Sequence, residues 1–160
     1  MADNDECLRT LAFHLLGSRD AMDDVLQEVY LKAHRRLAGF RGDAALSTWL
    51  YRITYTTCVD RLRRQARVRP APPDQLEDRL PRPAAVDEAF ALRDQLHRAL
   101  SSLSPERCAA VLLVLRDGHS YSEAAEILGV PPGTVASRVS HARRLLMKEL
   151  SLDDAGGEAR

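Results

Sequence analysis

Residues 120–146 read SYSEAAEILGVPPGTVASRVSHARRLL, two apolar-periodic stretches on either side of a turn rich in glycine and proline. Ser120 and Glu123 have the spacing of a capping box, which predicts the start of a short helix. Gly129 ends that helix, because glycine readily adopts the left-handed conformation that a sharp turn needs. The second stretch repeats apolar residues at helical spacing, at Val135, Val139, Ala142 and Leu146. The pattern favours a helix-turn-helix, with a plain helical hairpin as the alternative.

The second helix of this unit carries polar side chains of the kind that read DNA. Four of them are expected to face outward near its N-terminal half: Thr134, Ser137, Arg138 and His141. Hydrogen-bonding side chains at the start of a helix suit the base edges of a major groove. Arg143 and Arg144 follow, and guanidinium groups there suit phosphates. The competing interpretation is a basic helix face that only contacts solvent.

The first half of the chain predicts three helices, over residues 1–16, 21–37 and about 47–67. The second has one apolar face, and an acidic and polar face made by Asp23, Asp24, Gln27 and Glu28. Carboxylates repel DNA, so this face, if functional, suits a basic protein surface. Ser18 or Asp20 is expected to cap this helix.

The third predicted helix is strongly basic. Six arginines and a single acid, Asp60, lie between residues 52 and 69. Its outward face is expected to carry Arg52, Tyr55, Thr56, Arg61 and Arg64. Cations that follow a backbone, combined with aromatic rings such as Trp49 that accept unstacked bases, are typical of single-strand binding. Taken alone, the charge run also fits a solvated face, and Trp49 also fits a core position.

Prolines divide the chain. Five of the eight lie between residues 70 and 83, and proline disfavours helix at the residue before it. Four further helices are predicted after them, over residues 86–100, 105–116, 120–128 and 132–150. The expected fold is all-α, with two small helical domains joined by a flexible Pro-rich linker. The expected bounds are 1–68, 69–86 for the linker and 87–150, followed by a polar, frayed tail over 151–160.

Composition excludes several classes of protein. The formal net charge is zero, yet it sums a basic segment and acidic ones, so it does not argue against nucleic acid. No apolar run is long enough for a membrane span, and no secretory signal is present, so a cytoplasmic protein without membrane insertion is expected. Cys7, Cys58 and Cys108 form no metal-ligand or disulfide pattern. No phosphate loop or nucleophile–base set occurs, which predicts no enzyme, metal or cofactor.

Two long segments together resemble a known family. Residues 17–67 contain Asp-Asp-x-x-Gln-Glu, Phe-Arg-Gly and Thr-Trp-Leu, and residues 100–146 contain Gly-x-x-x-Gly-Thr-Val. Both segments, in this order and joined by a short variable linker, resemble regions 2 and 4 of the extracytoplasmic-function sigma factors. The resemblance covers the chain from Leu8 to about Leu150. It implies a bacterial RNA polymerase subunit that selects promoters.

The resemblance also implies roles for particular residues. Binding to the clamp helices of the β′ subunit maps onto Asp23, Asp24, Gln27 and Glu28. Melting and reading of the −10 element map onto Phe40, Arg41, Trp49, Arg52, Tyr55, Thr56, Asp60, Arg61 and Arg64. Reading of the −35 element maps onto Thr134, Ser137, Arg138, His141, Arg143 and Arg144. The implied partners are core RNA polymerase, through β′ and the β flap, promoter DNA and an anti-sigma protein.

The sequence departs from the family pattern at three places. The family usually has a further helical stretch before the position of Leu8. An asparagine is common where Thr56 stands, which predicts a different −10 specificity. A basic residue is common where Ala136 stands, and the loss of one contact predicts weaker −35 binding and a salt slope lower by about one.

Two alternatives stay open at this point. A stand-alone helix-turn-helix regulator, with a sensor or dimerisation domain in its first half, would bind duplex DNA without polymerase. That interpretation leaves the acidic helix and the basic Trp/Arg helix unexplained. A thiol-based redox sensor or metal-binding enzyme would have to use the three widely spaced cysteines.

Overall fold

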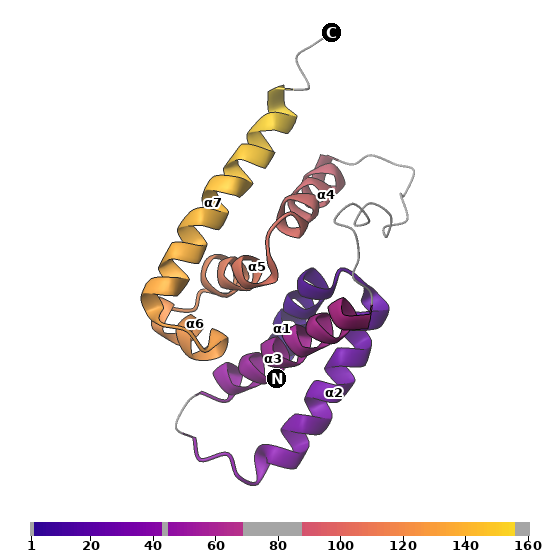
Figure 1. Cartoon of the computed structure of the whole chain (residues 1–160), viewed down its shortest axis with the longest axis vertical. Helices are drawn as coiled ribbons and strands as arrows, with labels where there is room; N and C mark the ends of the chain where they lie inside the picture. Colours follow the sequence, from indigo (N-terminus) through magenta and orange to yellow (C-terminus); the bar gives the residue numbers. More distant parts are fainter. Residues whose placement is uncertain (1, 43–44, 69–87, 156–160) are drawn as a thin grey trace.

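The computed structural model describes residues 2–42, 45–68 and 88–155, and it is helical throughout (Figure 1). No strand occurs in these residues, which confirms the predicted all-α class. The predicted linker over 69–86 lies outside the described residues. None of the described helices combines the length and the apolar character that crossing a membrane requires.

The N-terminal half contains three helices, α1 (Ala2–Leu16), α2 (Arg19–Leu37) and α3 (Leu46–Val68). Gly17, at a φ of 67°, separates α1 from α2. The Ser18 hydroxyl accepts a hydrogen bond from the Ala21 amide, so Ser18, one of the two predicted caps, starts α2. Leu8, Leu11, Val25, Leu26 and Val29 are almost completely buried between the helices.

The C-terminal half contains α4 (Glu88–Ser101), α5 (Pro105–Val111), α6 (Tyr121–Leu128) and α7 (Pro132–Ala155). The helix predicted over 105–116 is confirmed in its bounds, and its last part, Leu112–Arg116, is π-helical instead of α-helical. α7 runs five residues past its predicted end at residue 150, into the segment predicted as a tail. No glycine or proline interrupts the sequence there until Gly156.

The helix-turn-helix forms as its spacing predicts. The Glu123 amide donates to the Ser120 hydroxyl at 3.2 Å, and the Ser120 amide donates to the Glu123 carboxylate at 2.8 Å, which completes the capping box. Gly129 adopts a φ of 67° after the last turn of α6, and its amide donates to the Ala125 carbonyl. Small or branched buried residues let α6 and α7 approach: Ala124, Ala125, Val135, Val139 and Ala142.

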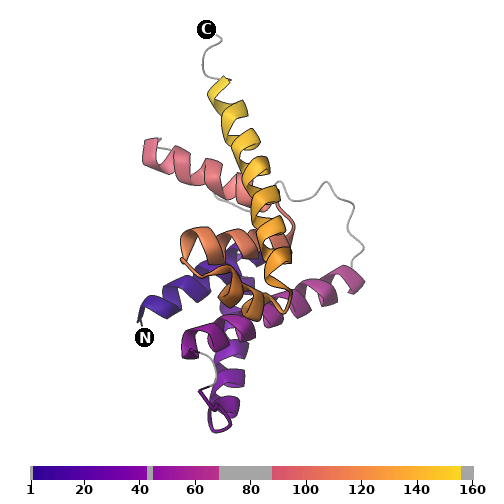
Figure 2. The same cartoon turned by 90° about the vertical axis from the view of Figure 1, so that its left-hand side faces the viewer.

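The two halves pack against each other around one continuous hydrophobic core. In both views of the chain α6 lies against α3, and the end of the helix-turn-helix unit sits on the N-terminal helices (Figures 1 and 2). α1 contacts α4 and α5 on the same side. The C-terminal part of α7 extends away from this junction. The described arrangement is therefore closed, with the two halves in direct contact.

Candidate nucleic-acid interface

The acidic face of α2 is exposed, as predicted from its spacing. The Asp23 and Asp24 side chains are 55% and 63% exposed, Gln27 is exposed and Glu28 is half-buried. Each carboxylate has a basic partner from its own chain: Arg9 to Asp23 at 3.1 Å, Arg61 to Asp24 at 3.1 Å and Lys32 to Glu28 at 2.7 Å. Exposed pairs of this kind contribute roughly 0–1 kcal/mol, so they yield readily to a stronger basic partner.

An apolar side chain that sequence reasoning missed lies on the same face. Leu31 is 57% exposed and follows Gln27 by four residues and Glu28 by three, so it lies one turn further along their side of α2. Single exposed leucines are common on protein surfaces, so it is the place of Leu31 beside the acidic residues that makes it a candidate contact. Its position one turn after Gln27-Glu28 was the available signal. The acidic face with Leu31 is called the α2 face below.

The basic surface of α3 is only partly outward. Arg52, Thr56, Asp60 and Arg64 are exposed, whereas Arg61 is half-buried against Asp24. Before α3, Arg41 is exposed and Phe40 is half-buried. The rings of Phe40 and Trp49 lie 5.2 Å apart, so the loop and the start of α3 share an aromatic pair of which neither member is fully buried.

The prediction that Tyr55 faces outward with Arg52 is wrong in this structure. Tyr55 is only 7% exposed, because the C-terminal helices cover its side of α3. It lines a cavity of about 330 Å³ together with Glu106 of α5 and Arg138 of α7. Burial is the main reason that the pKa of Tyr55 is raised, with Glu106 adding to it. Periodicity within α3 alone does not reveal a face that another half of the chain covers.

Most of the predicted −35 side chains on α7, the second helix of the helix-turn-helix, are at least partly accessible to solvent. Ser137, Arg143 and Arg144 are exposed, and Thr134 and His141 are half-buried. Arg138 is the exception to the predicted outward direction. It lines the cavity beside Tyr55, and its buried Nη1 atom has no hydrogen-bond partner among the described residues. The guanidinium of Arg138 therefore points toward the cavity beside Tyr55 and Glu106 in this arrangement.

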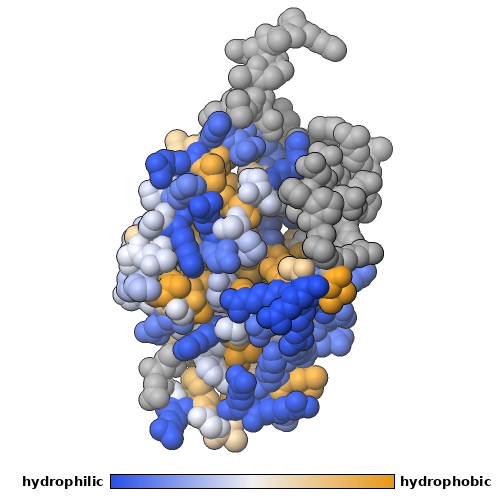
Figure 3. Space-filling model, viewed as in Figure 1, coloured by the Kyte–Doolittle hydropathy of each residue, from blue (hydrophilic) through white to orange (hydrophobic). Residues whose placement is uncertain are grey.

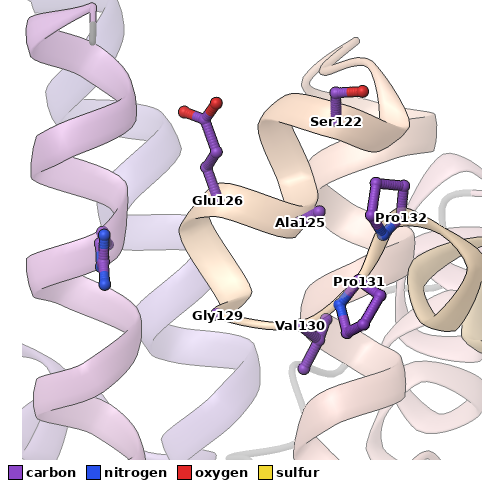
Figure 4. Close-up of a pocket in the computed structure, with 8 residues that line it drawn as sticks. Ser122, Ala125, Glu126, Gly129, Val130, Pro131 and Pro132 are labelled. Atoms are coloured by element: carbon purple, nitrogen blue, oxygen red, sulfur yellow. The ribbon is translucent and has the colours of Figure 1, made fainter. Parts of the chain in front are cut away.

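A second, more open hollow of about 460 Å³ lies where the turn of the helix-turn-helix approaches α3. Figure 4 shows Gly129, Val130, Pro131 and Pro132 along one side of it, with Glu126 projecting from α6. Arg52 of α3 lines it as well. The surface in Figure 3 is largely hydrophilic over the N-terminal helices, with apolar residues scattered among them. Of the predicted −35 residues, Arg138 meets predicted −10 residues, because it lines the 330 Å³ cavity together with Tyr55, Thr56 and Asp60.

Polar contacts join the halves beside this junction. The Tyr51 hydroxyl of α3 donates a hydrogen bond of 2.9 Å to the Asp117 carboxylate, and the His119 ring meets the Tyr51 ring edge-on at 4.8 Å. Arg116 donates to the Thr10 hydroxyl of α1 at 3.1 Å. Burial is the main cause of the raised pKa of Tyr51, and Asp117 contributes, so the phenol stays protonated and remains a donor.

The cysteines offer no metal or redox site in the described part of the chain. All three are free thiols, and no cluster of metal-ligating side chains occurs among the described residues. Burial raises the pKa of both Cys58 and Cys108 to about 12. A thiol with such a pKa is almost never a thiolate near neutral pH, so these two cysteines are unreactive. Cys58 and Cys108 therefore give no support to the redox-sensor alternative.

An acidic helix face, a basic helix with an aromatic pair, and a capped helix-turn-helix define a protein of the DNA-binding transcription factor class. Comparison with known families agrees. Sigma-70 region 2 matches residues 4–68, and Sigma-70, region 4, matches residues 93–146. The chain is 45% identical over 142 residues to the ECF RNA polymerase sigma factor SigM of Mycobacterium tuberculosis, covering 87% of this chain and 68% of that one.

Other relatives support the same assignment. The Escherichia coli ECF RNA polymerase sigma-E factor is 37% identical over 134 residues, which cover 77% of this chain and 70% of that protein. Among solved structures, the sigma factor RpoE bound to the anti-sigma factor NepR from Bartonella quintana superposes with a TM-score of 0.75, at 30% identity and 91% coverage of both chains. CnrH, bound to the cytosolic domain of CnrY, gives 0.66 at 25% identity, over 95% of this chain and 85% of that one.

The chain therefore belongs to the sigma-70 family of transcription initiation factors and, within it, to the extracytoplasmic-function sigma factors.

Proposed function

We propose that this sigma factor binds core RNA polymerase in the cytoplasm and directs it to promoters, without enzymatic chemistry of its own. In this proposal residues 1–68 act as region 2, 69–86 as the linker, 87–150 as region 4 and 151–160 as a tail. The observation that carries the proposal is the exposed acidic α2 face and a well-formed helix-turn-helix in one chain. A stand-alone regulator has no use for the first of these surfaces.

The α2 face is the proposed contact with the β′ clamp helices. The α2 face presents hydrogen-bond acceptors on Asp23, Asp24, Gln27 and Glu28. A basic protein surface can displace Arg9, Arg61 and Lys32 from the three carboxylates and bind them instead. Release of Arg61 from Asp24 would also free a cation on α3 for DNA. Leu31 would add an apolar contact next to Gln27 and Glu28, one turn further along α2.

The −10 element is assigned to the loop before α3 and to α3 itself. Phe40 and Trp49 supply half-buried rings on which an unstacked base can lie, at an expected gain of roughly 1–3 kcal/mol per base. Seven further side chains complete the proposed site: Arg41, Arg52, Tyr55, Thr56, Asp60, Arg61 and Arg64. Thr56 already donates its hydroxyl to backbone carbonyls of its own helix, so it reads DNA only as an acceptor unless it rotates.

The −35 element is assigned to α7. Ser137 is open to a major groove at once, Thr134 and His141 flank it, and Arg143 and Arg144 are placed for phosphates. Arg138 joins them only after the halves separate, because it now faces Tyr55 across the cavity. The C-terminal half would also contact the β flap of the polymerase.

Opening is therefore part of the proposed mechanism. Tyr55, from the −10 set, and Arg138, from the −35 set, line one cavity, where Tyr55 is buried and Arg138 is half-buried, so the closed arrangement restricts the access of DNA to both. Binding of the α2 face to polymerase would hold region 2 while region 4 moves to its own DNA site. The closed arrangement keeps the affinity of the free protein for DNA low.

An anti-sigma protein is the proposed negative regulator. This chain is structurally similar to RpoE, which is seen bound to the anti-sigma factor NepR, and to CnrH, which is seen bound to the cytosolic domain of CnrY. By that likeness, an anti-sigma protein would hold this chain in a form whose polymerase-binding and DNA-binding surfaces are occluded.

Run-off transcription with purified core polymerase tests the proposal. Core plus this chain should produce transcripts of defined length from a cognate promoter, and core alone should not. If the chain fails to bind core while shifting duplex DNA alone at nanomolar concentration, the stand-alone regulator is the better description and the sigma assignment of its surfaces fails.

A further inference from the structure

A small aromatic cluster joins α1 to α4 across the two halves. The ring of Phe13 stacks on the ring of His97 at 5.2 Å with an interplanar angle of 26°. The ring of His14 lies 5.2 Å from that of His97 and 5.7 Å from that of Phe13. Phe13 and His14 belong to α1 and His97 to α4, so the cluster exists only while the halves are closed. None of the proposed polymerase or DNA contacts uses it.

The position of His14 suits only a neutral ring. Its Nδ1 atom is buried and has no hydrogen-bond partner among the described residues. A charged imidazolium donates from both ring nitrogens, so protonation would bury a charged donor that lacks an acceptor. The groups that act on His14 from the packed elements are His97 of α4 and Arg116 of the π-helical segment, and both are basic. Among the described residues, no acid of α2, α3 or α5 compensates them.

His97 has a milder environment. Burial lowers its pKa, and only Asp94, on its own helix, acts in the opposite direction. Asp94 is shared with Arg98, which lies 3.4 Å away. For His14, burial first, then His97 and Arg116, lower the pKa to about 4. Both rings of the cluster therefore resist protonation while the halves are closed.

We propose that the His14–His97 contact is an acid-sensitive latch between the two halves, which holds the closed arrangement near neutral pH and releases it as the pH falls.

The direction of the pH effect follows from the difference in the pKa of His14 between the closed and open states. In a separated state His14 is exposed to water and recovers its ordinary pKa near 6.5, whereas in the closed state its pKa is about 4. The open state therefore binds the proton more tightly, and the population of the closed state falls as the pH falls below about 6.5. For His14 alone, the ratio of closed to open molecules falls about tenfold between pH 7.5 and pH 5.5. His97 shifts the ratio in the same direction.

Other contacts between the halves determine the closed-to-open ratio near neutral pH, before any histidine is protonated. Tyr51 to Asp117 and Arg116 to Thr10 do not involve a histidine and persist while the latch weakens. The ring of His119 meets the ring of Tyr51 beside the Tyr51–Asp117 hydrogen bond, so His119 is a further histidine between the halves. A His119→Phe variant separates its contribution from that of His14.

Single-molecule FRET on the whole chain tests the latch. Dyes attached through unnatural amino acids at exposed Arg35 of α2 and exposed Lys148 of α7 report closed and open molecules directly. The ratio is measured at about pH 7.5 and pH 5.5, with circular dichroism to confirm constant helicity. A Tyr51→Phe background removes one contact between the halves and raises the open population into the measurable range.

The variants make the test specific. His14→Phe keeps an aromatic ring without a titrating group, and its ratio should change less than threefold between the two pH values. His34→Phe, at an exposed position of α2, should keep the tenfold response of the unchanged protein. The latch is refuted if the closed-to-open ratio of the unchanged protein changes less than twofold between the two pH values, or if the ratio of His14→Phe changes as much as that of the unchanged protein. It is also refuted if no open molecules appear with either Tyr51 or Phe at position 51.

Discussion

The Tyr51 hydroxyl and the Asp117 carboxylate form a hydrogen bond of 2.9 Å although 66 residues separate them in the sequence. Tyr51 is 3% exposed, and the Asp117 side chain is 4% exposed and also pairs with Arg116. The bond therefore lies inside the closed junction between the halves, where water competes weakly for its partners. It ties a residue of α3 directly to the turn that leads into the helix-turn-helix.

Tyr51→Phe should loosen the closed arrangement and leave each half folded. Loss of one hydrogen bond to a charged acceptor that keeps Arg116 costs about 1–2 kcal/mol, which raises the open population roughly five- to thirtyfold. The FRET ratio described above measures it. Tyr30→Phe is the matched control, because Tyr30 bonds Asp5 within the N-terminal half, and this change should leave the ratio unaltered.

Reversing charge on the α2 face should abolish binding to core polymerase. Asp24→Arg with Glu28→Arg removes two carboxylate acceptors, one exposed and one half-buried, and adds two cations that repel a basic surface. Binding is measured by surface plasmon resonance on immobilised core, and helicity by circular dichroism. Glu6→Arg with Glu149→Arg makes the same charge change at exposed positions elsewhere and should bind normally. Unchanged affinity of the first variant would disprove the assignment of the α2 face.

Leu31→Ala should weaken the same interaction without any change of charge. Leu31 is already exposed in the free protein, so truncation costs folding little, whereas full burial of a leucine side chain on binding contributes roughly 1.5–3 kcal/mol. The dissociation rate from core should rise at least fivefold. Leu37→Ala, at the exposed C-terminal end of α2, provides the control. Equal effects of the two changes would show that Leu31 has no special place in the contact.

Arg138→Ala and Arg144→Ala should separate base reading from phosphate binding. Arg138→Ala should cost roughly 1–3 kcal/mol at a cognate −35 sequence in the assembled holoenzyme and little on scrambled DNA. Arg144→Ala should weaken both DNAs alike and lower the salt slope by about one. Fluorescence anisotropy over a salt series measures both. An equal loss on scrambled DNA for Arg138→Ala would make Arg138 a phosphate contact.

Two glycines of the helix-turn-helix should respond to alanine in opposite directions. Gly129 has a φ of 67°, where a Cβ atom is strained, so Gly129→Ala should destabilise the protein by about 1 kcal/mol. Gly133 lies inside α7 with open space around it, so Gly133→Ala should stabilise by roughly 0.5–1 kcal/mol. Thermal unfolding gives both values. A loss of stability in both variants would contradict this account of the turn.

Local patterns in the sequence were enough to predict most of the helices. The Ser120–Glu123 capping box, the left-handed Gly129 and the spacing of Val135 and Val139 each act within a few residues, and all appear in the structure. The acidic α2 face was predictable for the same reason, because its spacing places it opposite Val25 and Val29. The roles assigned to these surfaces, and the bounds of the two domains, stay predictions.

The rest depends on contacts between distant parts of the chain. Tyr55 and Arg138 lie on polar faces of their own helices and would be exposed if each half stood alone. They are covered because α6 packs on α3, and no periodicity within one helix contains that information. The cluster of Phe13, His14 and His97 was missed likewise, since its members are 83 or more residues apart across α1 and α4. The π-helical segment, Leu112–Arg116, contains no glycine or proline from which a change in helix type could be predicted.

That π-helical segment determines where the turn after it points. The Asp117 amide donates to the carbonyl of Leu112, five residues earlier, instead of the four of an ordinary helix. One extra residue in the turn rotates all that follows by about 100°. This rotation is part of the path that brings Asp117 to Tyr51. Deleting Leu115, an exposed residue, would restore a regular helix and turn Asp117 away from α3. The number of residues in this one turn would then determine how the two halves are oriented, without any change to the surfaces proposed to contact DNA or polymerase.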